Sequence, residues 1–404
     1  MSRQFLVGSF IEQARVSALL PQTARSSYRA VLLVFFFLTG VVFASWATRI
    51  PDIKLALGLS DAALGGILFG APFGELVAIV PSAWLIGRIH TRRTLLLSMT
   101  LLPICLVLLS LAPGRWQLFA ALFCFGFVYN MNNIALNAQA VGVEVLYRRS
   151  IIATFHGMWS LGGVVGGIIG AFVAPMGISV QAHFISILIL CLVIVAALQK
   201  AVMPREVRFG RPQTTGRQKL KFTPFLFVLG FIALGSMATE GAMYDWSAVY
   251  FAQVVRPGEE YIRFGYLSCM TCMVCVRLLA DRLVNRFGAA PVLQGSGLFI
   301  ACGMTLALTQ PTLLPAMAGL GMVGFGMASI VPLCYSLAGR SKDNPAQVGI
   351  SFVSSISFFG FLACPPMVGF LSHLFDLSWA LSPIILVGAA VFLLSRLLMR
   401  LHGE

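Results

Sequence analysis

Apolar runs long enough to cross a lipid bilayer recur along almost the whole chain, and no other feature limits its fold as strongly. A transmembrane helix needs roughly 20 apolar residues, and residues 30–199 and 222–399 each hold enough for about six such helices. With 58% hydrophobic and only 10% charged residues, the composition excludes an ordinary soluble domain. The short alternating segments typical of a transmembrane β-barrel are not visible. The sequence predicts an all-α polytopic membrane protein with twelve transmembrane helices in two pseudo-symmetric six-helix bundles.

Basic residues lie in short clusters between the apolar runs, and these clusters alternate along the chain. Positive residues concentrate on the cytoplasmic side of membrane proteins, so the alternation indicates the orientation. The formal net charge of +14 is explained in this way and does not indicate nucleic-acid binding. We expect both termini to lie in the cytoplasm. All Lys and Arg residues then fall on the cytoplasmic side except Arg49, Lys54, Arg115, Arg256 and Arg263.

The most basic stretch, from Lys200 to Lys221, divides the chain into two similar halves. The sequence WATRIP at Trp46 matches WSAVYF at Trp246, and LIGRIH around Arg88 matches LVNRFG around Arg286. Parallel repeats of six helices are typical of one large class of secondary transporters. The expected segments are a cytoplasmic tail (1–29), a six-helix bundle (30–199), a cytoplasmic linker (200–221), a second six-helix bundle (222–399) and a short tail (400–404).

Several motifs resemble those of the major facilitator superfamily, and together they extend over nearly the whole chain. The superfamily's signature between spans two and three, roughly G-x-L-x-D-R-x-G-R-R, appears here as AWLIGRIHTRR, residues 83–93. A second, degenerate copy, DRLVNRFG, has Asn285 at the position of the aspartate. In the first copy Leu85, Arg88, Arg92 and Arg93 match the signature, while Ala83, Gly87 and His90 replace its two glycines and its aspartate.

Four further stretches resemble a bacterial branch of this superfamily that contains inner-membrane carriers of the sugar, polyol and rhizopine type. They are WATRIPDIKLALGLSDAALG, FHGMWSLGG, EGAMYDWS and PPMVGFL. The resemblance implies a monomeric secondary active transporter that works by alternating access and needs no cofactor. The sequence contains no P-loop lysine motif and no compact set of nucleophile, base and orienting residue, so neither an ATP-driven pump nor an enzyme is indicated.

Two departures from the superfamily's drug/proton antiporters bear on the function. Those antiporters carry an arginine inside span four, and the chain has none between Trp116 and Leu146. Their span-five signature also contains a proline, which LGGVVGGIIG lacks. Both departures count against a classical drug/proton antiporter. We expect a secondary transporter of a small polar organic solute, with proton coupling through Glu240 as the favoured mechanism. Two alternatives stay open, namely efflux of drugs or metabolites and a membrane sensor or scaffold that transports nothing.

Ionisable residues within the membrane are costly, and we treat them as candidates for proton coupling. Glu240 lies about 18 residues into the expected span seven, or roughly 27 Å along a helix, which places it at or just beyond mid-membrane. Burial favours its neutral, protonated form. Asp245, Glu75 and His156 are the other candidates. The alternative is a structural role for each, such as a hydrogen bond from Glu75 to span eleven or helix packing by His156.

Charges near the ends of the spans are candidates for gating contacts. Arg49 and Asp245 fall near the outer ends of spans one and seven, where an ion pair between them would break on opening. The alternative is a pair of solvated charges that contributes little. At the cytoplasmic ends, we expect Glu144 to pair with Arg88 or Arg92, and Asp281 with Arg340.

Span four carries a row of amides that indicates a polar ligand. Asn130, Asn133 and Asn137 share one helix face, and amides suit hydrogen bonding to a hydroxylated or amide-bearing solute. Trp46, Tyr244 and Trp246 are candidates for stacking on a ring of the solute. Interhelical hydrogen bonds and anchoring at the membrane interface are the alternatives. Cys269, Cys272 and Cys275 have no histidine or second cysteine pair beside them, so we expect no metal site.

Overall fold

The computed structural model describes residues 22–147, 151–204, 221–341 and 343–403, and within these ranges every regular element is a helix. Eleven helical stretches there are long and apolar enough to cross a membrane. The first half holds α2 (Gln22–Ala56), α3 (Asp61–Leu68), α4 (Gly70–Ser110), α5 (Arg115–Tyr147), α6 (Ile152–Val173) and α7 (Val180–Leu198). The second half holds α8 (Pro224–Tyr250), a π-helix (Phe251–Val255), α9 (Phe264–Phe287), α10 (Ala289–Thr309), α11 (Leu313–Met327), α12 (Ile330–Ala338), α13 (Ala346–Leu374), α14 (Leu377–Leu381) and α15 (Pro383–Gly403).

One of these stretches, from Asp61 to Ser110, makes two crossings because the chain turns back at His90. The backbone of His90 has φ 68° and ψ 160°, far from helical values. On α5, the Asn130 side chain donates to the Glu75 carbonyl, while Asn132 accepts from the Ser98 hydroxyl. Glu75 and Ser98 therefore lie at one level, although a straight helix would hold them roughly 35 Å apart. The turn raises the crossings to twelve, which confirms the predicted fold class.

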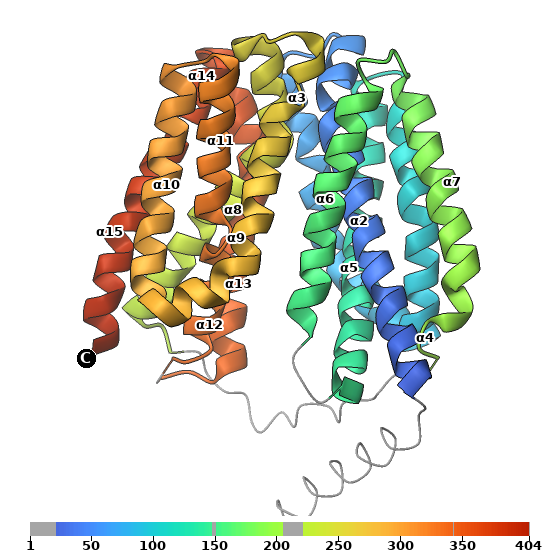
Figure 1. The fold of residues 1–404 in the computed structure, drawn as a ribbon, viewed down its shortest axis with the longest axis horizontal. Helices are drawn as coiled ribbons and strands as arrows, with labels where there is room; N and C mark the ends of the chain where they lie inside the picture. The colour runs from blue at the N-terminus through green and yellow to red at the C-terminus, as the bar shows by residue number, and fades with distance from the viewer. Residues whose placement is uncertain (1–21, 148–150, 205–220, 342, 404) are drawn as a thin grey trace, which may run out of the picture.

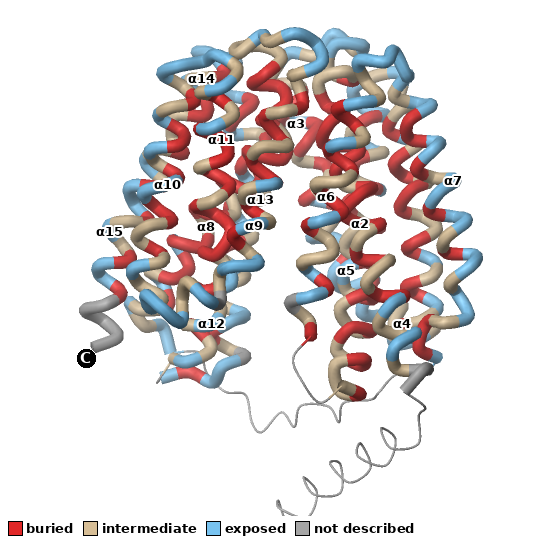
Figure 2. The backbone as a smooth tube through the Cα atoms, viewed as in Figure 1, coloured by how far each residue is buried: buried red, intermediate tan, exposed pale blue. Residues whose placement is uncertain are grey.

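The helices form two bundles that lie side by side (Figure 1). Helices α2 to α7 pack against one another, and so do α8 to α15. In each bundle the buried residues follow the inward helix faces, and the outer faces are largely exposed (Figure 2). We call the end of the molecule where α7 ends and α8 begins the linker end, and the opposite end, at Gly58 and Arg263, the distal end.

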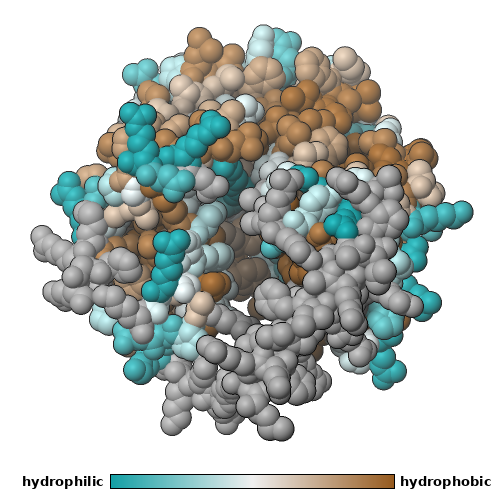
Figure 3. Space-filling view, turned by 60° about the horizontal axis from the view of Figure 1, so that its bottom comes forward, coloured by the Kyte–Doolittle hydropathy of each residue, from teal (hydrophilic) through white to brown (hydrophobic). Residues whose placement is uncertain are grey.

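The two bundles touch in their distal halves and separate towards the linker end (Figure 1). The contacts join α3 to α13, α6 to α9 and α2 to α8. Gly65 and Gly369 let α3 and α13 approach so closely that a Cβ atom on Gly65 would lie 2.8 Å from the Cα of Gly369. Seen from the linker end, the surface is hollowed near its centre (Figure 3). The fold is therefore sealed distally and open towards the linker end.

Helix boundaries differ from the sequence-based expectation at both ends of the chain. Helix α2 begins at Gln22 rather than at residue 30, and it continues through Pro51 to Ala56. Neighbouring groups can satisfy the carbonyl that a proline leaves free inside a membrane helix. Helix α15 extends to Gly403 rather than 399. Residues 1–21 of the expected tail and 205–220 of the expected linker lie outside the described residues.

The glycines of α6 form two packing surfaces. Gly162, Gly166 and Gly170 face α2 in the same bundle, where a Cβ on Gly162 would lie 2.0 Å from the Phe37 carbonyl oxygen. A pair on another face of α6, Gly163 and Gly167, lies against side chains of α9 in the opposite bundle. One glycine surface thus joins α6 to its own bundle, and the other forms a smooth contact between the bundles.

We expect Gly162→Ala to lower the free energy of unfolding by about 1–3 kcal/mol, because the added methyl group would overpack the α2–α6 contact. Gly157→Ala, in the same helix, is the matched control, since a Cβ there meets no atom within 4 Å. Thermal denaturation of the purified proteins in detergent measures the difference. Equal midpoints for the two variants would contradict the close packing of α6 on α2.

Candidate functional site

An aromatic cluster lies where the two bundles meet halfway along their length. Its members come from five helices: Phe43 of α2, Tyr129 of α5, Trp159 of α6, Tyr244 of α8 and Tyr266 of α9. The ring centroids of Phe43 and Tyr244 are 5.2 Å apart, and those of Tyr244 and Tyr266 are 6.5 Å apart. These separations are typical of interacting aromatic pairs. We call these five residues the central aromatic cluster.

A charged network adjoins this cluster and links the bundles. Arg277 of α9 donates from Nη2 to Glu240 Oε1 at 3.1 Å, and the Tyr244 hydroxyl donates to the same oxygen at 2.5 Å. Arg277 Nη1 donates to the Ser160 hydroxyl at 3.1 Å. Ser160 belongs to α6 in the other bundle, so Arg277 connects an ion pair of the second bundle to the first.

Arg277 is the main residue of this site that the sequence reasoning missed. Its position near the expected end of span eight, close to Arg282 and Arg286, placed it among the cytoplasmic charges. The structure places Arg277 inside α9, about ten residues before the helix ends, where it forms an ion pair with Glu240. Apolar residues on both sides, MVCV before it and LLA after it, were the signal that could have identified an intramembrane charge.

The other predicted proton-coupling residues lie around this network. Glu75 and Asp245 come from opposite bundles, and their carboxylates are close enough for the charges to interact. His156 is exposed, one turn before Ser160 on α6, within electrostatic range of Arg277. The structure therefore brings His156 and Glu240 near Arg277, and it brings Glu75 near Asp245.

The predicted solute-binding residues separate into two groups. Tyr244 lies in the central aromatic cluster, and Asn133 is exposed on the face of Tyr129, one helical turn nearer the linker end. Asn137 donates to the Asn133 side chain at 2.7 Å. Asn130 instead bonds to α4, as the alternative interpretation expected.

Trp46 and Trp246 are 2% and 0% exposed, so neither ring is accessible to a solute in this conformation. Their stacking on a solute stays a prediction. Their equivalent burial reflects the repeat, in which both occupy the same position of a bundle's first helix.

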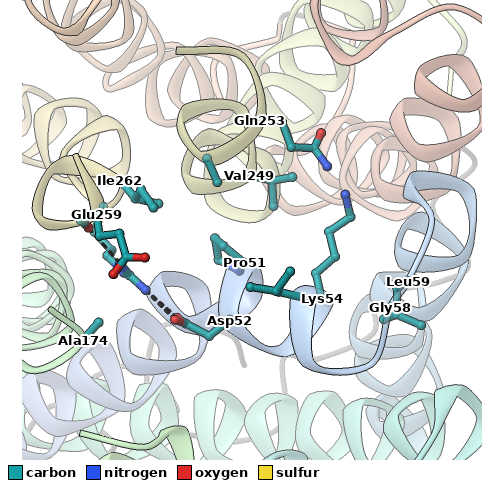
Figure 4. A pocket seen from close by; sticks show the side chains of 13 residues that line it. Pro51, Asp52, Lys54, Gly58, Leu59, Ala174, Val249, Gln253, Glu259 and Ile262 are labelled. Carbon is teal, nitrogen blue, oxygen red and sulfur yellow. Dashed lines mark hydrogen bonds and ion pairs between the residues drawn. The ribbon is translucent and has the colours of Figure 1, made fainter. Parts of the chain in front are cut away.

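At the distal end, ion pairs and hydrogen bonds hold the bundles together. Arg263 Nη2 donates to both carboxylate oxygens of Asp52, at 2.6 and 2.7 Å. Asp61 accepts from Lys54 of its own bundle and from Gln253 and Ser372 of the other. A recess of about 410 Å³ lies beside these contacts, lined among others by Asp52 and Arg263, and Lys54 and Gln253 point towards each other across it (Figure 4). We call Asp52, Lys54, Asp61, Gln253, Arg263 and Ser372 the distal latch.

The expected outer contact between Arg49 and Asp245 is not formed among the described residues. Arg49 is buried and donates to His183 Nδ1 at 3.2 Å and to the Ile178 carbonyl at 2.8 Å. These bonds attach α2 to the start of α7 within one bundle. The distal latch, built from neighbouring charges, takes the place of the predicted pair.

The contacts expected at the linker end also differ from the structure. Glu144 accepts from the backbone N–H groups of Ile151 and Ile152 and thereby caps α6. Arg92 donates to the Gln199 carbonyl, and Arg88 lies 5.3 Å from the Trp84 ring. Glu144 and both arginines belong to one bundle, so a pair between them would not join the bundles.

Asp281 and Arg340 likewise belong to a single bundle. Arg340 is exposed, and the Asp281 side chain lies outside the described part of the structure. Their pairing stays a prediction, and it concerns the helices of the second bundle alone.

Comparisons with known proteins agree with this architecture. Residues 30–348 match the family model described as Major Facilitator Superfamily. An uncharacterized MFS-type transporter of Yersinia pestis is 30% identical over 345 residues, which cover 85% of this chain and 89% of that protein. Membrane protein MosC of Rhizobium meliloti is 29% identical over 359 residues, covering 88% and 86%.

Solved structures resemble the chain in fold. A bacterial homolog of the human lysosomal transporter Spinster, in an inward-facing and unoccupied conformation, has a TM-score of 0.69 at 16% identity, covering 94% of this chain and 99% of that one. The nucleoside transporter NupG has a TM-score of 0.68 at 12% identity, covering 93% and 99%. At these identities the likeness shows the fold alone.

We expect Asp61→Asn to open the distal end, because it removes the charge that Lys54, Gln253 and Ser372 share. Hydrogen bonds to charged groups contribute roughly 1.5–3 kcal/mol, so the distal-open population should rise about 10- to 100-fold. Spin labels at Leu55 and Leu314, both exposed at the distal end of opposite bundles, report this opening as a longer distance. Asp376→Asn is the control, since Asp376 only caps α14 and asparagine also caps. An unchanged distance distribution in Asp61→Asn would show that Asp61 does not hold the distal end closed.

Proposed function

Because the chain belongs to the major facilitator superfamily, we propose that it carries a small polar organic solute across the bacterial inner membrane by alternating access. The protein is a multi-pass membrane transporter and not an enzyme. The observation that carries the proposal is the charged network of Arg277, Glu240 and Ser160, which lies beside the central aromatic cluster between the two bundles. In transporters built from parallel repeats, solute sites lie near mid-membrane at the interface of the repeats.

The structure corresponds in this proposal to the state open to the cytoplasm. The distal latch is closed and the linker end is hollow (Figure 3). The excess of basic residues at the linker end supports a cytoplasmic location for that end.

The polarity of the site favours a polar solute over an apolar drug. An intramembrane ion pair is expensive to maintain, and a site for apolar molecules has no need of one. Asn133 adds an exposed amide one turn from Tyr129. Efflux of a drug-like compound and a sensor role are the competing functions, and uptake into proteoliposomes separates a transporter from a sensor.

Proton coupling through Glu240 is part of the proposal. In the present state Arg277 Nη2 lies 3.1 Å from Glu240 Oε1. A proton exchanged at Glu240 would change this bond, which would couple protonation to a rearrangement at the centre. Glu75 and Asp245 are the second candidates, because they come from opposite bundles and lie within electrostatic range of each other.

We expect Glu240→Gln to abolish proton movement driven by the solute while solute binding remains. The solute is first chosen by a thermal-shift screen over sugars, polyols, amino acids and drugs. A pH-sensitive dye inside proteoliposomes then reports proton entry during uptake. Glutamine keeps the size of the side chain and its hydrogen bond from Tyr244 but cannot exchange a proton.

Glu260→Gln is the matched control, since Glu260 is exposed in the distal loop before α9, away from the central network. It should transport solute and protons as the natural protein does. Proton movement that persists in Glu240→Gln would transfer the role to Asp245 or Glu75. Solute uptake without any proton movement in the natural protein would leave facilitated diffusion as the mechanism.

A further inference from the structure

Two arginines make bonds between the bundles, and they differ in how firmly they are held. Arg263 in the distal latch has a side chain only 5% exposed, and it meets both oxygens of Asp52 at 2.6 and 2.7 Å. Arg277 has a side chain 27% exposed and meets one oxygen of Glu240 at 3.1 Å. Short, paired contacts characterise a structural ion pair, and the looser contact of Arg277 leaves it able to exchange partners.

Arg277 also has donors to spare. Its bonds to Ala328, Ser160 and Glu240 occupy three of the five N–H groups of a guanidinium. The bond to the Ala328 carbonyl is long, at 3.4 Å. The guanidinium can therefore donate to another acceptor that approaches from the hollow.

A further donor near Arg277, the Tyr266 hydroxyl, is buried without a hydrogen-bond partner among the described residues. A Cβ on Gly163, one turn beyond Ser160 on α6, would lie 3.9 Å from this hydroxyl. Buried donors without acceptors are rare in folded proteins because each one costs free energy. The surplus of donors indicates a ligand that supplies acceptor oxygens.

We propose that Arg277 binds a carboxylate group of the solute, with Tyr266 as a further donor, so that the solute is an organic acid or a zwitterion. This inference rests on the proposed transport function. A planar guanidinium matches the two oxygens of a carboxylate better than a single hydroxyl does. The central aromatic cluster then contacts the rest of the molecule.

The charges balance in this exchange. Before binding, the positive Arg277 is paired with the negative Glu240. After binding, Arg277 is paired with the solute carboxylate, and Glu240 takes one proton and becomes neutral. Leaving Glu240 charged and unpaired would be costly within the membrane. One proton therefore accompanies each carboxylate, and together they leave the net charge at the centre unchanged. The ammonium group of a zwitterion adds one positive charge to this sum.

The test uses pairs of compounds that differ only in one carboxylate: glucose and glucuronate, galactose and galacturonate, and alaninol and alanine. Calorimetry on the purified protein should show binding of the acid from at least one pair, with the neutral member about 10- to 100-fold weaker. Arg277→Gln should weaken binding of the acid by a similar factor. Arg115→Gln, which changes an exposed arginine at the distal end of α5, should leave it unchanged.

Arg277→Gln leaves Glu240 without its ion-pair partner and could fail to fold. The double variant Arg277→Gln/Glu240→Gln removes both charges together, and it should fold while binding the acid and the neutral member alike. The inference is overturned if no acid binds, if neutral members bind as tightly, or if the double variant keeps the preference for the acid. If a neutral solute is then taken up into proteoliposomes, the proposed transport function still holds and only the carboxylate inference fails. If the acid instead binds through Arg277 but is not taken up, the transport function fails and carboxylate binding by Arg277 still holds.

Discussion

A charge held in the middle of a membrane must have a partner, and the ion pair of Arg277 and Glu240 satisfies this requirement at the point where the two bundles meet. Arg277 is bonded at once to Glu240 of α8, to Ser160 of α6 and to the Ala328 carbonyl between α11 and α12. The pair is thus not confined to one helix contact. Any movement of one bundle against the other changes the surroundings of the guanidinium.

The rest of the interface is organised around this centre in two unlike halves. On the distal side, close contacts such as Gly65 on Gly369 and the charges of the distal latch seal the bundles. On the linker side the bundles separate (Figure 1), and the surface is hollowed near its centre (Figure 3). The glycines of α6 suit this arrangement, because one set attaches the helix to α2 and the other leaves a smooth surface towards α9.

The sequence predicted the helices and their number well, since each crossing is a continuous apolar run with its own length requirement. Glu240 could also be found, because it stands alone among apolar residues. Tertiary contacts could not be predicted in the same way. The pairing of Arg49 with Asp245 followed from their positions along two helices, but helix rotation turns Arg49 towards His183 instead. Arg277 was hidden by the basic residues that follow it.

The position of Ser160 connects the central site to the opening of either end. It lies on α6 between the exposed His156, on the side of the hollow, and Gly163, which packs on α9. The bond between Ser160 and Arg277 therefore marks the boundary between the open half and the closed half. If the bundles rock so that the distal half opens, Ser160 must move relative to Arg277, and this bond must lengthen or break. The partner that Arg277 binds, whether Glu240 or a solute, is affected by this movement. The occupancy of the central site and the opening of the distal or linker end are therefore coupled.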